Sequence, residues 1–198
     1  MISPNLRRAL IVSVFLVLGA AVFLYNSGQN DIKEIEVHAD YINFENLQKL
    51  DEFSQLVVVA TPIKDFNDRV QKTEYFPDGS MMDFYSLTNV KIEKVIKAPN
   101  DFDRSISNLD IVEPVSLVTN GSGLKKLKRE GYTELKKGNT YIIYLTKGGK
   151  NYYSVNGFNG RINIGDTDPD DEGKGEEKEL KKAFKKEAQT KYPELFKK

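Results

Sequence analysis

The fold is decided by the stretch Leu56-Val57-Val58-Val59-Ala60-Thr61, which ends at Pro62. Its residues are apolar and mostly β-branched at successive positions, so a strand made of them is apolar on both faces. Such a strand belongs in the centre of a sheet, because each face needs its own cover. Residues 140–145 have the same character and predict a second central strand. Within them, Tyr141 and Tyr144 would face opposite ways, which could leave one of them exposed for a ligand.

A third strand is predicted over residues 84–96, which lie further along the chain. Val90 and Ile92 share one face of this strand, and the alternation continues until Val95 breaks its parity. A break of this kind is typical of a bulge, which we expect near residues 93–94. The side chains that we expect to be nearly buried in the core are Val57, Val59, Ile92, Ile111 and Ile143.

The remaining strands are less regular. Residues 109–118 predict a strand in which Pro114 marks an edge position or a bulge. Residues 124–135 are basic and predict an irregular connection. Short strands are expected over residues 151–155 and 157–164. About five strands, mostly joined by hairpins, are too few for an immunoglobulin sandwich and favour a small, partly open Greek-key barrel of the OB type.

Two short helices are expected to flank the barrel. Residues 44–53 have apolar side chains three apart, with Asn43 as the N-cap. Residues 176–189 begin with glutamates and end with lysines, which suits a helix dipole. The apolar stripe of this second helix is narrow, so we expect it to pack weakly and residues 166–198 to be dispensable for folding. The domains are then residues 1–25 (cytoplasmic N-terminus and transmembrane anchor), 26–43 (linker), 44–164 (barrel) and 165–198 (acidic loop and charged helix).

The N-terminal segment predicts where the protein is located. Residues 9–25 carry no charge and are long enough to span a membrane as a helix. Arg7 and Arg8 precede them and favour a cytoplasmic N-terminus. A cleaved signal peptide and a buried soluble helix are the alternatives. The first two interpretations both place residues 31–198 outside the cytoplasm, and the anchor predicts a single-pass protein of the cell membrane.

Three parts of the chain carry a resemblance to a known group of proteins: residues 56–61, which end in Ala60-Thr61, residues 88–97, and residues 135–145. Their order resembles uncharacterised Gram-positive membrane-anchored exported proteins with an OB-like, metalloproteinase-inhibitor-like barrel. The resemblance covers residues 44–164 and implies a mainly β fold: an N-terminal transmembrane helix, then a small OB-like Greek-key barrel with short flanking helices. The chain lacks the N-terminal cysteine and the disulfides of the animal inhibitors, so inhibition is not implied.

Composition excludes several classes of function. The chain of 198 residues has 29 Lys and Arg against 29 Asp and Glu, which rules out a generally basic nucleic-acid binder. It has no cysteine and one histidine, which excludes a thiolate nucleophile, Cys-ligated metals and multi-His metal sites. His38 stands in acidic sequence with no Gly-x-Ser-x-Gly motif elsewhere, and we assign no catalytic residue.

One acidic segment is a candidate metal site. Asp166, Asp168 and Asp170 are spaced by two, and Glu177 stands at the twelfth position counted from the first of them. Carboxylate oxygens at this spacing are what a calcium loop supplies. However, Asp171 replaces the glycine that such a loop needs at its sixth position. The alternative is an acidic, solvated helix N-terminus.

One basic segment is a candidate site for anionic ligands, and it consists of Lys125, Lys126, Lys128 and Arg129. It could meet lipid headgroups, an anionic cell-wall polymer or an acidic partner protein. The alternative is a solvated surface loop. No aromatic platform accompanies these residues, so nucleic acid is not expected as a partner.

Together these observations predict a non-enzymatic binding module held on the outside of the membrane, with no cofactor. Two alternatives remain. The first is an exported hydrolase that acts on the cell wall through a pair of carboxylates. The second is a calcium-dependent adhesion or sensor module, which depends on the acidic segment.

Overall fold

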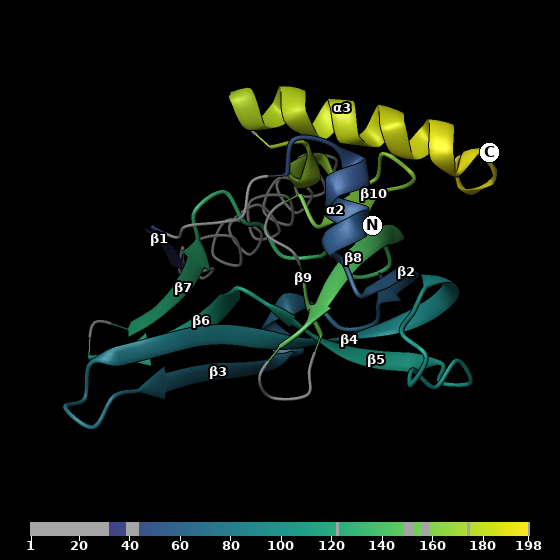
Figure 1. Ribbon diagram of the computed structural model, residues 1–198. Coiled ribbons are helices and arrows are strands. Elements are labelled where there is room, and N and C mark those ends of the chain that lie inside the picture. The colour runs from purple at the N-terminus through teal and green to yellow at the C-terminus, as the bar shows by residue number, and fades with distance from the viewer. Residues whose placement is uncertain are drawn as a thin grey trace, which may run out of the picture. The chain divides into compact units, whose positions relative to one another are not determined.

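The computed structural model describes residues 32–38, 44–121, 123–148, 153–155, 159–173 and 175–197 (Figure 1). These residues form ten strands and two α-helices, so the expectation of a mainly β protein is confirmed. The candidate anchor at residues 1–25 and most of the linker lie outside the described residues. Within the described ranges, no helix is both long and apolar enough to cross a membrane.

The elements follow one another along the chain with these bounds. The strands are β1 (Lys33–Val37), β2 (Leu56–Pro62), β3 (Val70–Tyr75), β4 (Met81–Lys97), β5 (Asn108–Glu113), β6 (Val115–Asn120), β7 (Gly123–Arg129), β8 (Tyr141–Lys147), β9 (Tyr153–Val155) and β10 (Arg161–Asn163). The helices are α2 (Leu47–Phe53) and α3 (Glu176–Lys191), and the 3-10 turns are η1 (Phe66–Asp68), η2 (Pro169–Glu172) and η3 (Pro193–Leu195).

The larger sheet has seven strands in the order β10-β8-β2-β4-β5-β9, with β3 paired to β4. The short strand β9 also pairs with β8. Among the described residues, the parallel contact of β9 with β5 comprises Ile111↔Tyr153 and Val112↔Ser154. The sheet therefore has more strands than the five expected, and the structure shows no closed barrel.

The second sheet has three strands in the order β1-β7-β6, and it differs most from expectation. Residues 109–118 are not one strand, because Pro114 lacks an N–H group and separates β5 from β6, which belongs to this second sheet. The basic segment, expected to be irregular, forms β7 with Leu127 buried. Gln71 of β3 accepts the Leu117 N–H at 2.9 Å and links the two sheets.

The central strands are covered on both faces, as expected. Val58 of β2 and Ile143 of β8 belong to one buried cluster, whereas Val57 and Tyr144 belong to another. The second cluster lies under α2 and α3, which occupy the same side of the sheet in Figure 1. Tyr141 is also fully buried, so the expectation that one of the two tyrosines is exposed is wrong.

Local details follow the sequence pattern in part. The pairing of β2 with β4 moves from Val59↔Lys94 to Ala60↔Ile92, which confirms the bulge by skipping Glu93. Of the five side chains expected in the core, Val57, Val59, Ile111 and Ile143 are buried, and Ile92 is half-buried. The N-cap of α2 is Asn46 rather than Asn43, because its side chain accepts the Lys49 N–H at 2.9 Å.

The C-terminal helix packs more firmly than its narrow stripe suggested. Phe184 and Ala188 of α3 are buried in the cluster beneath it, and Lys181 is also buried. The expectation of a weakly packed tail was wrong because it counted only the apolar residues. It missed the buried Lys181, which pairs with Asp171 of η2 and so reaches Arg161 of β10, the other partner of this carboxylate.

Candidate functional site

A cleft rich in paired charges lies between β1, β7, the segment after β7, η2 and the start of α3. Its volume is about 280 Å³. We call it the charged cleft, and its charged residues are Glu34, Glu36, Lys126, Lys128, Glu134, Lys136, Asp170 and Glu177.

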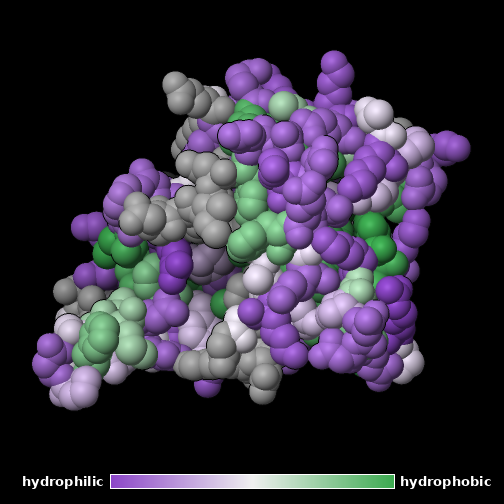
Figure 2. Space-filling model, viewed as in Figure 1, coloured by the Kyte–Doolittle hydropathy of each residue, from purple (hydrophilic) through white to green (hydrophobic). Residues whose placement is uncertain are grey.

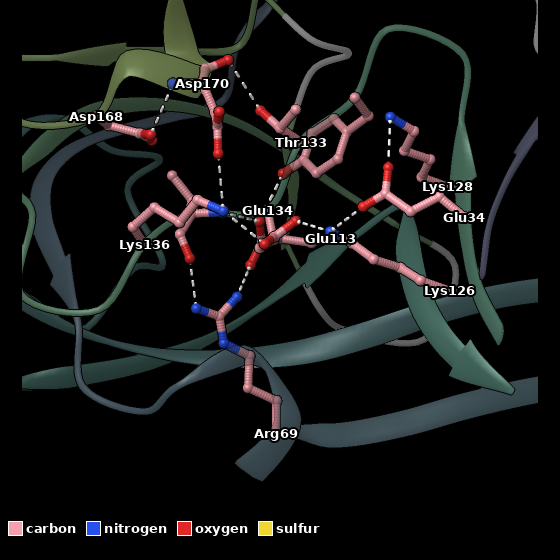
Figure 3. A network of polar contacts seen from close by, with 12 residues as sticks. Glu34, Arg69, Glu113, Lys126, Lys128, Thr133, Glu134, Lys136, Asp168 and Asp170 are labelled. Carbon is pink, nitrogen blue, oxygen red and sulfur yellow. Dashed lines mark hydrogen bonds and ion pairs between the residues drawn. The ribbon is translucent and has the colours of Figure 1, made fainter. Parts of the chain in front are cut away.

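One half of the charged cleft joins β1 to β7 (Figure 3). Glu34 of β1 lies 2.9 Å from the Lys126 amine and 3.1 Å from the Lys128 amine, and Glu36 lies 3.0 Å from Lys128. The side chains of the two lysines are only 15% exposed. Because residues alternate across a strand, Lys126 and Lys128 share a face, while Leu127 between them points into the sheet's own small core.

The other half of the charged cleft centres on Glu134. Its carboxylate lies 2.7 Å from Lys126 and 2.7 Å from Lys136, and Lys136 also pairs with Asp170 at 3.1 Å. Burial alone would raise the pKa of the Glu134 carboxyl, but the two lysines outweigh burial and lower this pKa to about 2. The ion pairs therefore form one continuous chain, in which acids and bases alternate from β1 to η2.

A second, fully buried pair lies beneath the cleft (Figure 3). Arg69, which follows η1, donates to the Glu113 carboxylate of β5 at 2.7 Å, and neither side chain is exposed. The same carboxylate accepts the Tyr132 hydroxyl at 2.8 Å, the Leu135 N–H at 2.7 Å and the Thr88 hydroxyl. Four donors surround the carboxylate, so Glu113 organises this region.

A third cluster connects η2, β10 and α3. Asp171 accepts from Arg161 at 2.9 Å and from Lys181 at 2.7 Å. Burial would raise the pKa of the Asp171 carboxyl, but Lys181 and Arg161 together hold it below its usual range. Burial lowers the pKa of the Lys181 amine to about 8, and the charge of Arg161 acts in the same direction. Arg161 also lies over the Tyr132 ring, with Cζ 4.8 Å from its centroid, and so connects this cluster to the previous one.

The four acids of the predicted calcium site are not brought together. Asp166 pairs with Lys185, Asp170 pairs with Lys136, and Asp168 accepts the Tyr141 hydroxyl at 2.7 Å. A Cβ atom placed on Gly131 would lie 2.5 Å from Glu177 Oε1, so this carboxylate faces the segment after β7. In the part of the chain that the structure describes, no three His, Cys, Asp or Glu residues are grouped as metal ligands. The spacing matched, but separate partners take each carboxylate.

The four basic residues of the predicted anion site lie together on β7, but they do not form one patch. Lys126 and Lys128 turn into the charged cleft, where acids neutralise them. Arg129 pairs with Asp83 of β4 at 3.0 Å. Lys125 is half-exposed and lies on the face opposite to Lys126. Three of the four cations are therefore already engaged with acids of the same chain.

An exposed apolar group stands at the end of the hairpin formed by β3 and β4. We call it the hairpin tip: Tyr75, Phe76, Met81 and Met82, whose exposed fractions are 54%, 49%, 40% and 48%. In Figure 1 this hairpin extends beyond the rest of the sheet, and Figure 2 shows hydrophobic atoms gathered at the same projecting end. The turn between the strands is Pro77-Asp78-Gly79, where Gly79 has a φ of 84°.

Comparison with known proteins found no relative of this chain. No family model matches the chain, and neither curated proteins nor solved structures give a match. The resemblance to exported Gram-positive proteins therefore stays a prediction, and function must be argued from the residues themselves.

Sequence reasoning missed the hairpin tip and the pairing partners of the basic segment. No motif considered in the sequence analysis includes Tyr75 or Phe76. The signal that could have found them is a turn motif flanked on both sides by two adjacent large apolar residues. Adjacent residues face opposite sides of a strand, so such pairs at a turn leave at least one side chain of each pair on an exposed face.

Proposed function

We propose that this chain is a non-enzymatic binding module, held at the cell membrane by a single pass near its N-terminus and exposing its β domain outside. We further propose that the domain is an OB-like barrel. In support of the barrel, neighbouring strands pair in the order β2-β4-β5-β9-β8, and β8 then pairs with β2 again. The small number of β5–β9 contacts is compatible with the partly open barrel that is typical of this fold.

The observation that carries the binding proposal is the hairpin tip. Monomeric soluble proteins seldom gather exposed large apolar side chains without a purpose, and such patches mark interaction sites. Here four of them occupy one projecting turn. Exposing them to water is unfavourable, whereas covering them with a partner recovers the hydrophobic contribution of their surface.

The charges around the hairpin tip favour a protein as the partner. Glu74 and Asp78 lie beside the tip on the same hairpin, and their charge would repel an anionic membrane or an anionic wall polymer. Three of the four β7 cations that could attract such a polymer are paired in the charged cleft or with Asp83. A protein surface with an apolar pocket and basic rim fits this combination best.

The ionisation of the described carboxyl groups supports binding over hydrolysis. A glycoside hydrolase needs one carboxyl group whose pKa is raised so that it can donate a proton. In the described part of the chain, wherever the surroundings move a carboxyl pKa from its ordinary value, they lower it. Glu134 and Asp171 are the most buried of these groups, and neighbouring cations lower the pKa of each.

Photo-crosslinking in intact cells tests this proposal. A photoreactive amino acid replaces Phe76 in the full-length chain, and the matched control carries it at Ile63, which is exposed away from the tip. We expect a discrete protein adduct from position 76 that Met82→Ser suppresses, and none from position 63. Equal adducts at the two positions, or adducts to lipid alone, would contradict the proposal.

A further inference from the structure

Strand β1 is attached to the domain on one side only. Among the strands that the structure describes, it is the outermost of the second sheet and pairs with β7 alone. Four of its five residues are exposed, and only Ile35 is half-buried, against Phe84, Val118 and Leu127. The two glutamates in the ion pairs between β1 and β7 are about half exposed, which limits what the pairs contribute to stability. A strand held by such pairs, by one apolar side chain and by the backbone hydrogen bonds of a single edge can leave that edge.

The contacts of β1 define what this edge recognises. Glu34 and Glu36 pair with Lys126 and Lys128, and Ile35 between them enters the small core of the sheet. The Val37 carbonyl accepts the Glu130 N–H at 3.0 Å, which extends the backbone contact beyond the side chains. The pattern is an acid, an apolar residue and an acid in an extended segment.

The edge of β7 would be incomplete without such a segment. Among the described residues, the only acids that pair with Lys128 are Glu34 and Glu36, both from β1. Lys126 keeps Glu134 when β1 is absent, whereas Lys128 keeps no ion pair with a described residue. Lys128 and the free backbone edge of β7 thus form a ready-made position for an extended acidic strand.

We propose that the outer edge of β7 is a strand-addition site for a partner protein that presents an extended acid–apolar–acid segment, and that β1 occupies this site in cis. Binding then requires displacement of β1. The apparent affinity for a partner equals the intrinsic affinity multiplied by the fraction of molecules in which β1 has left the edge. This site is separate from the hairpin tip, and it goes beyond the function proposed above. Main-chain hydrogen bonds supply the affinity, and the two lysines select the acids.

The test uses the full-length chain in detergent and a fluorescent peptide with the sequence of residues 32–38. In the variant Glu34→Lys/Glu36→Lys, the cis strand is repelled by β7, and we expect this variant to bind the peptide at least about tenfold more tightly than wild type. The same peptide with glutamine at both acidic positions is expected to bind at least about tenfold more weakly. Fluorescence anisotropy gives both affinities.

A matched control and a second variant keep the test decisive. Glu45→Lys/Glu52→Lys makes the same change in charge on exposed residues at α2 and should bind like wild type. Ile35→Ala removes only the apolar contact of β1 and should also raise affinity for the peptide. Absence of any gain in both β1 variants overturns the proposal. A different result would assign the edge to β1 of a second copy: the wild-type protein has twice the mass of a monomer, and the β1 variants take up no peptide.

Discussion

Removal of the buried Glu113 carboxylate should destabilise the domain more than any exposed change. In Glu113→Ala, the Arg69 guanidinium keeps its contacts with the Leu135 and Lys64 carbonyls but loses its counter-charge in a fully buried position. The Tyr132 hydroxyl and the Leu135 N–H lose their acceptor at the same time. The Thr88 hydroxyl also loses this acceptor and keeps only its contact with Arg69. The perturbation therefore leaves one charge and two polar groups unpaired in the core, and a third polar group with one partner fewer.

The size of the effect follows from these groups. Removing one partner of a buried ion pair costs about 3–5 kcal/mol, and the two orphaned donors place this site at the upper end of the range. With a urea dependence of about 2 kcal/mol per molar, a loss of about 5 kcal/mol lowers the urea midpoint by about 2.5 M. Such a loss is comparable to the whole stability of many domains.

Urea unfolding of the full chain, followed by circular dichroism, measures this difference. Asp110→Ala on the same strand removes an exposed contact with Asn89 and should change the free energy of unfolding by less than about 0.5 kcal/mol. The double variant Arg69→Met/Glu113→Leu should recover part of the loss, because it removes the unpaired charge, while the Tyr132 hydroxyl and the Leu135 N–H still lack their acceptor. A Glu113→Ala midpoint equal to that of wild type would refute the reasoning, as would a double variant no more stable than the single one.

The Lys181 amine has a pKa of about 8 in the folded state and 10.5 as its ordinary value, so the unfolded chain binds more protons between these pH values. The free energy of unfolding of wild type should therefore rise with pH in this window, by up to about 3 kcal/mol relative to Lys181→Met. Urea unfolding of both proteins from pH 7 to 10 measures this, and a difference between their midpoints that does not change with pH would argue against it. Phe184→Ala should lower the free energy of unfolding by about 3–5 kcal/mol, and a chain that ends at residue 164 should fail to fold. An unchanged urea midpoint for Phe184→Ala would show that α3 is dispensable. Protease added to intact protoplasts should digest the residues after Asn30, and complete protection of the chain would exclude export. Val14→Arg should release or misroute the protein from membranes, which fractionation measures.

The central strands could be predicted because their pattern is continuous along the chain. In β2 and β8, every residue needs cover, and no other local structure of that length satisfies such a run. Strand β7 could not be predicted this way, since its only buried apolar residue is Leu127 and its other contacts are made by lysines. Long lysine side chains can cover apolar surface with their stems, so a strand rich in lysine has the composition of a loop.

The candidate site was less predictable than the fold, for a different reason. The spacing of Asp166, Asp168 and Asp170 was visible, but the groups that engage them are distant in sequence: Lys185, Tyr141 and Lys136. Ion pairs between strands depend on which strands become neighbours, and a single sequence does not reveal this. The tail was misjudged because its contact with the rest of the domain runs through a buried carboxylate: Asp171 of η2 pairs with both Lys181 of α3 and Arg161 of β10.

The hairpin that ends in the exposed tip also fixes a distance. Strand β4 runs without interruption from Met81 at the tip to Val90 in the core, a span of about 30 Å at about 3.3 Å per residue. Shortening both strands by one residue would bring the tip nearer by one step and turn its side chains to the opposite face. Shortening both by two would restore the facing at a reach about 7 Å smaller. If the same side chains are to contact the partner, both strands must change length by two residues at a time. The distance between the domain and a partner bound at the tip can therefore change only in steps of about 7 Å.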